Sequence, residues 1–260
     1  MSRIKKQLIY GFFYICVLGI VVLLFLSPKL TPAPSCSDNI QNQGETGVDC
    51  GGPCLPCYLK QAKPLEESGI PYIFKSVSLS KVFAVVSVVN NNADLGLDSF
   101  SYSADFLDGN KNLVGTVSGY DNIFPNESKY LIIEYDGSAY DVGRISDIDF
   151  KINQNESWKK SADFLVPSVS VSSGPIVSSS TGAVVVSGVV QNQSAFSVPS
   201  LRVTAFLYDK YGNPLFAGKT LLNNISGFGT STFYVYMPQS VFEGSQFVSS
   251  TAQVFLNAEE

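Results

Sequence analysis

The chain has 260 residues, enough for one large domain or for two domains of about 100 residues with additional segments. Apolar residues make up 45% of the sequence and charged residues 15%, which excludes a chain that is disordered by composition. There is no histidine, so Ser-His-Asp and Cys-His triads, His-containing zinc sites and His general bases are excluded. The net charge of −5 argues against a nucleic-acid partner, whose phosphates need clustered cations.

The amino-terminal segment predicts a membrane anchor. Residues 8–26 are all apolar or glycine, and at about 1.5 Å per residue they cover roughly the thickness of the hydrocarbon core. We therefore expect a transmembrane helix over residues 8–27. Residues 1–7 hold three bases: Arg3, Lys5 and Lys6. Because positive charges favour the cytoplasmic side, we expect residues 1–7 to be a cytoplasmic stub of a single-pass protein of the cell membrane, with the remainder of the chain outside the cell. A cleaved signal peptide is the alternative interpretation.

Residues 28–58 predict a proline-containing spacer followed by a disulfide-rich module. Four of the five cysteines of the chain lie in this segment: Cys36, Cys50, Cys54 and Cys57. Outside the cytoplasm such a set indicates two disulfides, and the sequence does not choose among the three possible pairings. A zinc site with four thiolate ligands is the alternative, but the second CxxC half-site that it needs is lacking.

The stretch CSDNIQNQGETGVDCGGPCLPC resembles a short Cys-rich module that recurs in prokaryotic cell-surface and secreted proteins. Many relatives have Gly after the first Asp, where this chain has Asn39, and Asn tolerates the left-handed conformation best after Gly. A calcium site is one interpretation, because Asp38, Asn42, Glu45 and Asp49 offer oxygen ligands. We prefer the interpretation that these acids cap turns and bond to the loop backbone, and we expect no metal and no cofactor.

From residue 73 onward the sequence alternates between β-branched and polar residues, with turn residues every 8–12 positions. This pattern is typical of antiparallel sandwiches or barrels. After a linker over residues 59–72, we expect an all-β fold with two tandem immunoglobulin-like antiparallel β-sandwiches, over residues 73–165 and 166–260.

An internal repeat at an offset of 101 residues supports two copies of one domain. Asn91 pairs with Asn192 and Asp108 with Asp209, and one residue enters the turn that follows Asp108 in the second copy. A period near 100 residues is a whole domain repeated, because solenoid repeats are much shorter.

The second copy resembles the FxLYD family over roughly residues 183–237. The strand ending in V-x-N-x-S, the strand ending in F-L-Y-D and the G-x-x-L hairpin carry this likeness through six residues: Asn192, Phe206, Leu207, Tyr208, Asp209 and Gly212. The resemblance implies a seven-stranded, extracytoplasmic sandwich similar to late-embryogenesis-abundant (WHy-type) domains, and no catalytic residues come with it. In a strand, Phe206 and Tyr208 face one side and Leu207 the other, while Asp209 opens a tight turn.

The remaining acids give weak support for catalysis, because they are scattered over strands and turns: Asp105, Asp108, Glu134 and Asp136. We expect a non-enzymatic, membrane-anchored binding, scaffold or adhesion protein of the cell envelope. Its partners would be membrane lipid, through the helix, and an envelope protein or glycan. The alternative is an accessory subunit of a larger membrane complex, and an envelope hydrolase that uses carboxylates ranks third.

Overall fold

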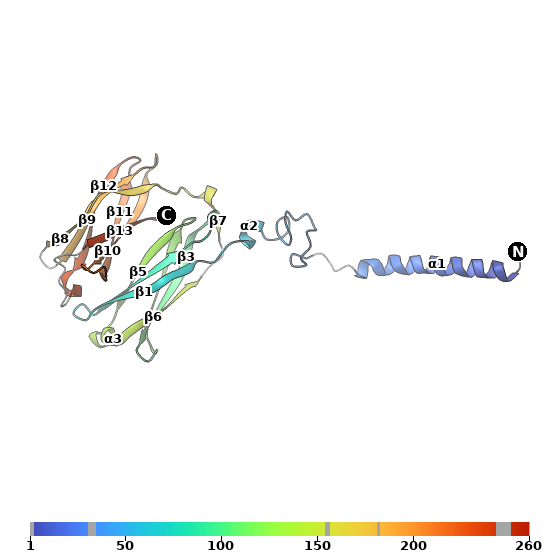
Figure 1. The fold of residues 1–260 in the computed structure, drawn as a ribbon, viewed down its shortest axis with the longest axis horizontal. Coiled ribbons are helices and arrows are strands. Elements are labelled where there is room, and N and C mark those ends of the chain that lie inside the picture. The colour runs from blue at the N-terminus through green and yellow to red at the C-terminus, as the bar shows by residue number, and fades with distance from the viewer. Residues whose placement is uncertain (1–2, 31–34, 154–156, 181–182, 243–250, 260) are drawn as a thin grey trace. The chain divides into compact units, whose positions relative to one another are not determined.

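The computed structural model describes residues 3–30, 35–153, 157–180, 183–242 and 251–259. The chain forms two compact units, residues 1–61 and residues 62–260 (Figure 1). The predicted fold class is confirmed: strands in antiparallel sheets make up most of the chain, and one apolar helix lies at the amino terminus.

The first unit contains helix α1 (Arg3–Leu30), and within it Arg3–Phe25 is long and apolar enough to cross a membrane, with a mean hydropathy of 2.7 over an 18-residue window. Every side chain of Arg3–Phe25 is exposed. The helix therefore extends beyond the predicted span of residues 8–27 at both ends. Pro32 and Pro34 of the expected spacer lie outside the described residues. After the disulfide module comes the short helix α2 (Cys57–Lys60).

The second unit begins with a sandwich of one three-stranded and one four-stranded antiparallel sheet, which we call the first sandwich. The strands of one sheet, in spatial order, are β1 (Glu66–Ser76), β2 (Lys81–Val89) and β5 (Ser128–Asp136). Those of the other are β4 (Leu113–Ile123), β3 (Leu95–Asp108) and β6 (Ile145–Asn153). Smaller elements complete it: α3 (Ala139–Arg144), β7 (Lys159–Lys160), which pairs with β3, and the 3₁₀ helix η1 (Ser161–Asp163).

Strand β1 begins inside the segment expected to be a linker, residues 59–72. The strand pairs with β2 from Glu66 onward, and its register shifts between Ser68 and Tyr72. Gly69 has a φ of 79° and Pro71 carries no amide hydrogen, so both residues interrupt an ordinary strand pattern. The strand continues past them through a bulge, which the period-2 pattern alone does not reveal.

The second sandwich repeats this topology. One sheet has the order β8 (Val169–Ser180), β9 (Ala183–Asn192) and β12 (Thr230–Pro238). The other has the order β11 (Pro214–Ile225), β10 (Val198–Tyr208) and β13 (Thr251–Glu259). The 3₁₀ helix η2 (Gln239–Phe242) follows β12. Among the described residues this sandwich has six strands, whereas the family resemblance implies seven.

The repeat has a different register in its first strands from the one expected. Asn90 and Asn192 are both buried, and each side-chain amide donates to backbone carbonyls of later loops. Asn91, the expected partner of Asn192, is exposed and bonds to Glu66. The pairing of Asn91 with Asn192 is therefore wrong by one residue. In valine-rich strands a shift of one residue still aligns apolar with apolar positions, so the sequence does not reveal the slip.

The expected insertion in the turn is also wrong. The turns Asp108–Asn112 and Asp209–Asn213 have the same length, and each closes with the same backbone hydrogen bond from the aspartate amide to the asparagine carbonyl. The one-residue difference falls instead near the end of β4, where the pairing with β3 shifts between Leu97 and Phe100. The corresponding pairing of β10 with β11 has no such shift, because β11 has one residue more there than β4. In the first sandwich the unmatched residue of β3 forms a bulge.

The two sandwiches pack against each other within the second unit. Apolar residues of β1, β2 and β5 contact residues of β10, β11 and β13. The unit is consequently a stack of four sheets, in which the β4-β3-β6 sheet and the β8-β9-β12 sheet are the two outer layers (Figure 1). Each sandwich keeps its own core of alternating inward side chains, mostly valine, leucine and phenylalanine.

Candidate functional site

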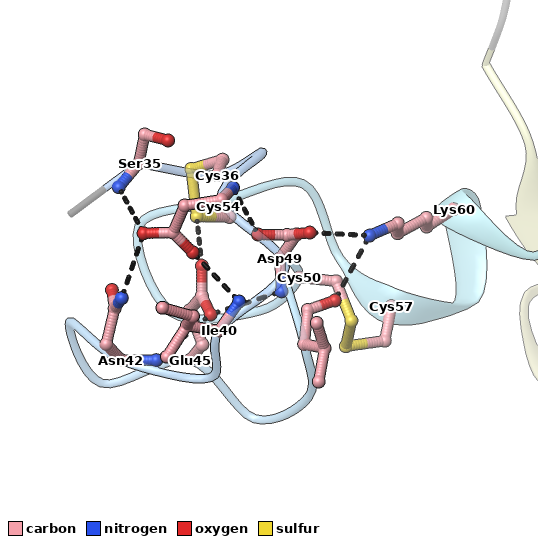
Figure 2. Close-up of a disulfide and its surroundings, with 12 residues drawn as sticks. Ser35, Cys36, Ile40, Asn42, Glu45, Asp49, Cys50, Cys54, Cys57 and Lys60 are labelled. Carbon is pink, nitrogen blue, oxygen red and sulfur yellow. Dashed lines mark hydrogen bonds and ion pairs between the residues drawn. A yellow bond between two sulfur atoms is a disulfide. The ribbon is translucent and has the colours of Figure 1, made fainter. Parts of the chain in front are cut away.

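The disulfide module, residues 35–60, is closed by two interleaved bonds. Cys36 pairs with Cys54 and Cys50 with Cys57, as Figure 2 shows. The prediction of two disulfides is confirmed, and the structure selects one of the three pairings. All four thiols are consumed, which leaves no thiolate for the alternative zinc site. Cys16 of α1 is a free cysteine.

The carboxylates of this module bind its own backbone. Asp49 accepts hydrogen bonds from the amides of Asp38 and Asn39, at 2.9 and 3.0 Å, and forms an ion pair with Lys60. The Glu45 carboxylate is buried and accepts from the amides of Asn42 and Asp49 (Figure 2). This arrangement favours the interpretation of the acids as turn-capping groups, because each carboxylate accepts hydrogen bonds from two backbone amides.

Asp38 has the same role at the start of the module. Its carboxylate accepts from the side chain of Asn42 and from the amides of Ser35 and Ile40. The side-chain hydrogen bond from Asn42, followed by the Ser35 amide, lowers the pKa of Asp38 below its usual value. Asn39 has a φ of 60°, in the left-handed region that Asn tolerates best after Gly.

A metal is not supported at the one cluster of donor atoms found among the described residues. Atoms of Cys36, Glu45 and Cys54 lie within 4.8 Å of one another. The two sulfurs are bonded to each other, however, and a disulfide sulfur is not a thiolate ligand. The 3.0 Å approach of Cys54 Sγ to Glu45 Oε1 is a contact and not a hydrogen bond, because that sulfur carries no proton.

Two of the residues that carry the FxLYD resemblance, Asp209 and Gly212, define the hairpin turn. The carboxylate of Asp209 accepts from the amides of Tyr211 and Asn213 and from the side chain of Asn213. The asparagine side-chain bond and then its backbone bond lower the pKa of Asp209. Gly212 has a φ of 86°, the left-handed conformation that glycine adopts without strain. In the first copy Lys111 has this conformation, with a φ of 64°.

Asn192 ties together the loops at the other end of the second sandwich. Its side-chain amide donates to the carbonyls of Phe196, Ile225 and Ser226, and its carbonyl accepts from the amide of Ser194. The residue is completely buried. This role is structural, since all four contacts are made with the backbone of the same sandwich.

Phe206 and Tyr208 face away from the core of their own sandwich, on the side opposite Leu207. Phe206 is buried between the two sandwiches, where its ring centroid lies 4.8 Å from that of Tyr130 and 6.0 Å from that of Tyr72. Further rings complete what we call the aromatic seam: Phe74, Phe83, Phe216 and Phe255. Phe206 of the F-L-Y-D sequence thus joins the two sandwiches.

A buried ionic network lies beside the aromatic seam. Lys129 is completely buried, and its Nζ donates to Asp121 Oδ1 at 2.9 Å and to two oxygens of Asn122. Asp121 also binds Arg202 of β10, which in turn pairs with Glu259 of β13. Burial works against the charge of Arg202, but Asp121 and Glu259 outweigh it and raise the pKa of the guanidinium.

A groove of about 400 Å³ opens between the sandwiches. Its apolar walls include Phe83, Ile132 and Phe216, and Tyr236 of β12 lies at one side. Two lysines line it: Lys81 pairs with Glu134 and Asp136, and Lys219 Nζ donates to the carbonyl of Ile132. A groove of this size is within the range of ligand sites.

The four acids weighed for catalysis do not form one site, although Glu134 and Asp136 lie against the same lysine. Asp105 bonds to Thr116 and Lys151 on the outer sheet of the first sandwich, and Asp108 closes its hairpin turn. Glu134 and Asp136 share the cation of Lys81. Each acid therefore has a structural partner.

Sequence reasoning missed the ionic network and the groove. Both depend on the packing of one sandwich on the other, which the repeat pattern does not encode. One signal was present in the sequence: positions that are charged in the first copy, such as Asp105, are aromatic in the second.

No family model matches the chain, and no curated protein matches it.

Proposed function

We propose that this chain is a membrane-anchored, non-enzymatic binding or scaffold protein of the cell envelope, with residues 35–260 on the extracytoplasmic side. The observation that carries the proposal is that the buried and clustered polar groups of the chain bind other groups of the same chain. The carboxylates of the disulfide module and the buried charges between the sandwiches bind the chain's own backbone and one another. Such groups hold a framework, and binding would fall to exposed faces and grooves.

Three further features support the location. The apolar helix α1 has the length of a membrane span, and the bases before it favour a cytoplasmic amino terminus. The two disulfides are typical of an oxidising compartment outside the cytoplasm. The FxLYD resemblance of residues 183–237 agrees with an extracytoplasmic sandwich.

The test uses the full-length protein in its native membrane. Protease added to intact cells should remove residues 62–260 while leaving the amino terminus protected, and cross-linking should join a saturable envelope partner to those residues. Protection of residues 62–260 in cells with a permeable outer layer would contradict the topology. A stable complex held through α1 alone would favour the alternative of an accessory subunit.

A further inference from the structure

The β8-β9-β12 sheet contains no Asp, Glu, Lys or Arg in any of its three strands. Its inward side chains fill the core, and its outward side chains form a solvent-facing surface, which we call the neutral face. The strand pairing places these outward residues in three rows, in which Val185 is buried: Tyr236, Val185 and Ser178; Tyr234, Ser187 and Ile176; Thr232, Val189 and Ser173. Tyr236 is 66% exposed, Tyr234 51% and Ile176 61%.

The opposite outer layer of the same unit is an internal comparison. The β4-β3-β6 sheet is likewise an antiparallel sheet with one face turned to solvent, and its outward residues include Asp105, Asp147, Asp149 and Lys151 beside the exposed Tyr120. Exposed sheets usually carry such charges, because charges oppose association of sheets with one another. The lack of charge is therefore a property of the neutral face and not of the fold.

We propose that the neutral face binds an uncharged polysaccharide chain, an inference that rests on the proposed function as a binding protein. The rings of Tyr234 and Tyr236 follow one another along β12, with centroids 6.5 Å apart and planes inclined by 31°. Consecutive exposed rings can stack on the apolar faces of consecutive sugar rings. The hydroxyls of neighbouring Tyr, Ser and Thr side chains supply donors and acceptors for sugar hydroxyls.

The lack of charged residues on the neutral face argues against anionic ligands. An anionic glycan or an anionic membrane surface needs Lys or Arg, and the three strands supply none. A neutral sugar chain needs no counter-charge, so desolvation of the neutral face leaves no charged group without a partner.

The size of the neutral face fits a chain better than a protein. Three strands spaced about 4.8 Å apart, with about nine residues each at about 3.3 Å, cover roughly 400 Å², about half of the ~800 Å² that each partner buries in a standard protein interface. The β8 edge also resists strand pairing with a second copy, because it has two register shifts and contains Pro175.

The groove between the sandwiches extends this surface. Tyr236 belongs to both, since it also lines the groove. A chain that lies along β12 and passes Tyr236 therefore meets Lys81 and Glu134, whose charged groups can bond to sugar hydroxyls.

The experiment measures binding of neutral hexasaccharides to the full-length protein in lipid nanodiscs. The probes are cellohexaose, mannohexaose and chitohexaose, with the hexamer of galacturonic acid as an anionic control. We expect at least one neutral probe to bind, with an affinity that does not change between low and high salt. Tyr234→Ala and Tyr236→Ala should each weaken binding about tenfold. The matched control Tyr120→Ala, on the charged outer sheet, should leave binding unchanged.

A second variant separates ring stacking from a folding defect. Tyr234→Phe keeps the aromatic ring and should keep most of the affinity, and both residues are exposed, so thermal unfolding should not change. Failure of all three neutral probes to bind, or binding that is insensitive to both tyrosines, overturns the inference. If an envelope protein is captured through the same face instead, the proposed binding function stands and the glycan inference falls. If the protein binds neither a neutral probe nor an envelope protein, the proposed binding function and the glycan inference both fail.

Discussion

Asp105 and Phe206 occupy the same position in the two sandwiches and face opposite environments. Asp105 lies on β3 opposite Thr116 of β4 and Asp149 of β6, and Phe206 lies on β10 opposite Ala217 of β11 and Gln253 of β13. Asp105 bonds to Thr116 and Lys151, whereas Phe206 is buried in the aromatic seam. The β4-β3-β6 sheet of the first sandwich is therefore an outer layer, whereas the equivalent β11-β10-β13 sheet of the second sandwich is an interior layer.

Replacement of Phe206 should test the seam directly. Phe206→Ala removes a ring that contacts Tyr72, Tyr130 and Phe255, and we expect the free energy of unfolding to fall by about 3 kcal/mol. Asp105→Ala at the equivalent position should change it by less than about 1 kcal/mol. Urea unfolding of the full-length protein measures both, and equal losses would argue against a seam that stabilises the pair.

The ionic network should be far more sensitive than surface ion pairs. Asp121→Asn leaves the buried Lys129 without a carboxylate, so we expect destabilisation of about 3–5 kcal/mol. Asp149→Asn breaks an exposed pair with Lys151 and should cost less than about 1 kcal/mol. The same unfolding measurement applies, and a small effect at Asp121 would mean that Lys129 finds other acceptors in solution.

The register of the repeat can be tested with two neighbouring asparagines. Asn192→Ala and Asn90→Ala each leave buried carbonyls without a donor, so each should cost about 2–3 kcal/mol. Asn91→Ala removes one exposed hydrogen bond to Glu66 and should have little effect. If Asn91→Ala lowered the free energy of unfolding more than Asn90→Ala, the result would support the pairing of Asn91 with Asn192 that the offset of 101 predicts.

The hairpin turn of the second sandwich should lose stability in acid. Because hydrogen bonds from Asn213 lower the folded pKa of Asp209, the carboxylate stabilises the fold fully above the unfolded pKa of about 3.9, and this contribution is lost as pH falls through the folded value. Asn213→Ala should raise the pKa of Asp209 toward its ordinary value. An NMR titration of the Asp209 carboxyl carbon checks this, and an unchanged pKa would assign the shift to the backbone amides.

The disulfides should differ in their contributions to the module. The Cys36–Cys54 bond closes a separation of 18 residues and the Cys50–Cys57 bond one of 7, so loss of the first should destabilise the module by about 3 kcal/mol and loss of the second by about 2 kcal/mol. Non-reducing peptide mapping should recover these two pairs. A Cys36–Cys50 bond in the native protein would contradict the pairing. Reduction should leave the unfolding of residues 62–260 unchanged, because they form a separate compact unit.

Local patterns in the sequence predicted the elements but not their assembly. The apolar run predicted helix α1, the clustered cysteines predicted the disulfides, and alternation predicted the strands, because each depends on neighbouring residues. The orientation of Phe206 and Tyr208 opposite to Leu207 was predicted correctly from the period of a strand. Which surface buries Phe206 depends on residues more than 70 positions away in the chain, such as Tyr130, and no local pattern specifies that contact.

The errors have the same origin. Asn90, Asn91 and Asn92 are consecutive, and only the hydrogen bonds of the folded loops distinguish the buried Asn90 as the partner of Asn192. The groove beside Tyr236 and the charges around Asp121 arise where two sandwiches meet. Residues at such places look like ordinary surface residues when each copy is considered alone.

The aromatic seam has a consequence for biosynthesis. The first sandwich leaves the ribosome before the second, so Phe74, Phe83 and Tyr130 are exposed to water until β10 and β13 have been synthesised. A chain that ends near residue 165 would leave this apolar surface exposed to water and would be a substrate for chaperones and quality-control proteases. Cutting the gene between the two copies therefore yields two aggregation-prone products, although each has the strand topology of a complete sandwich.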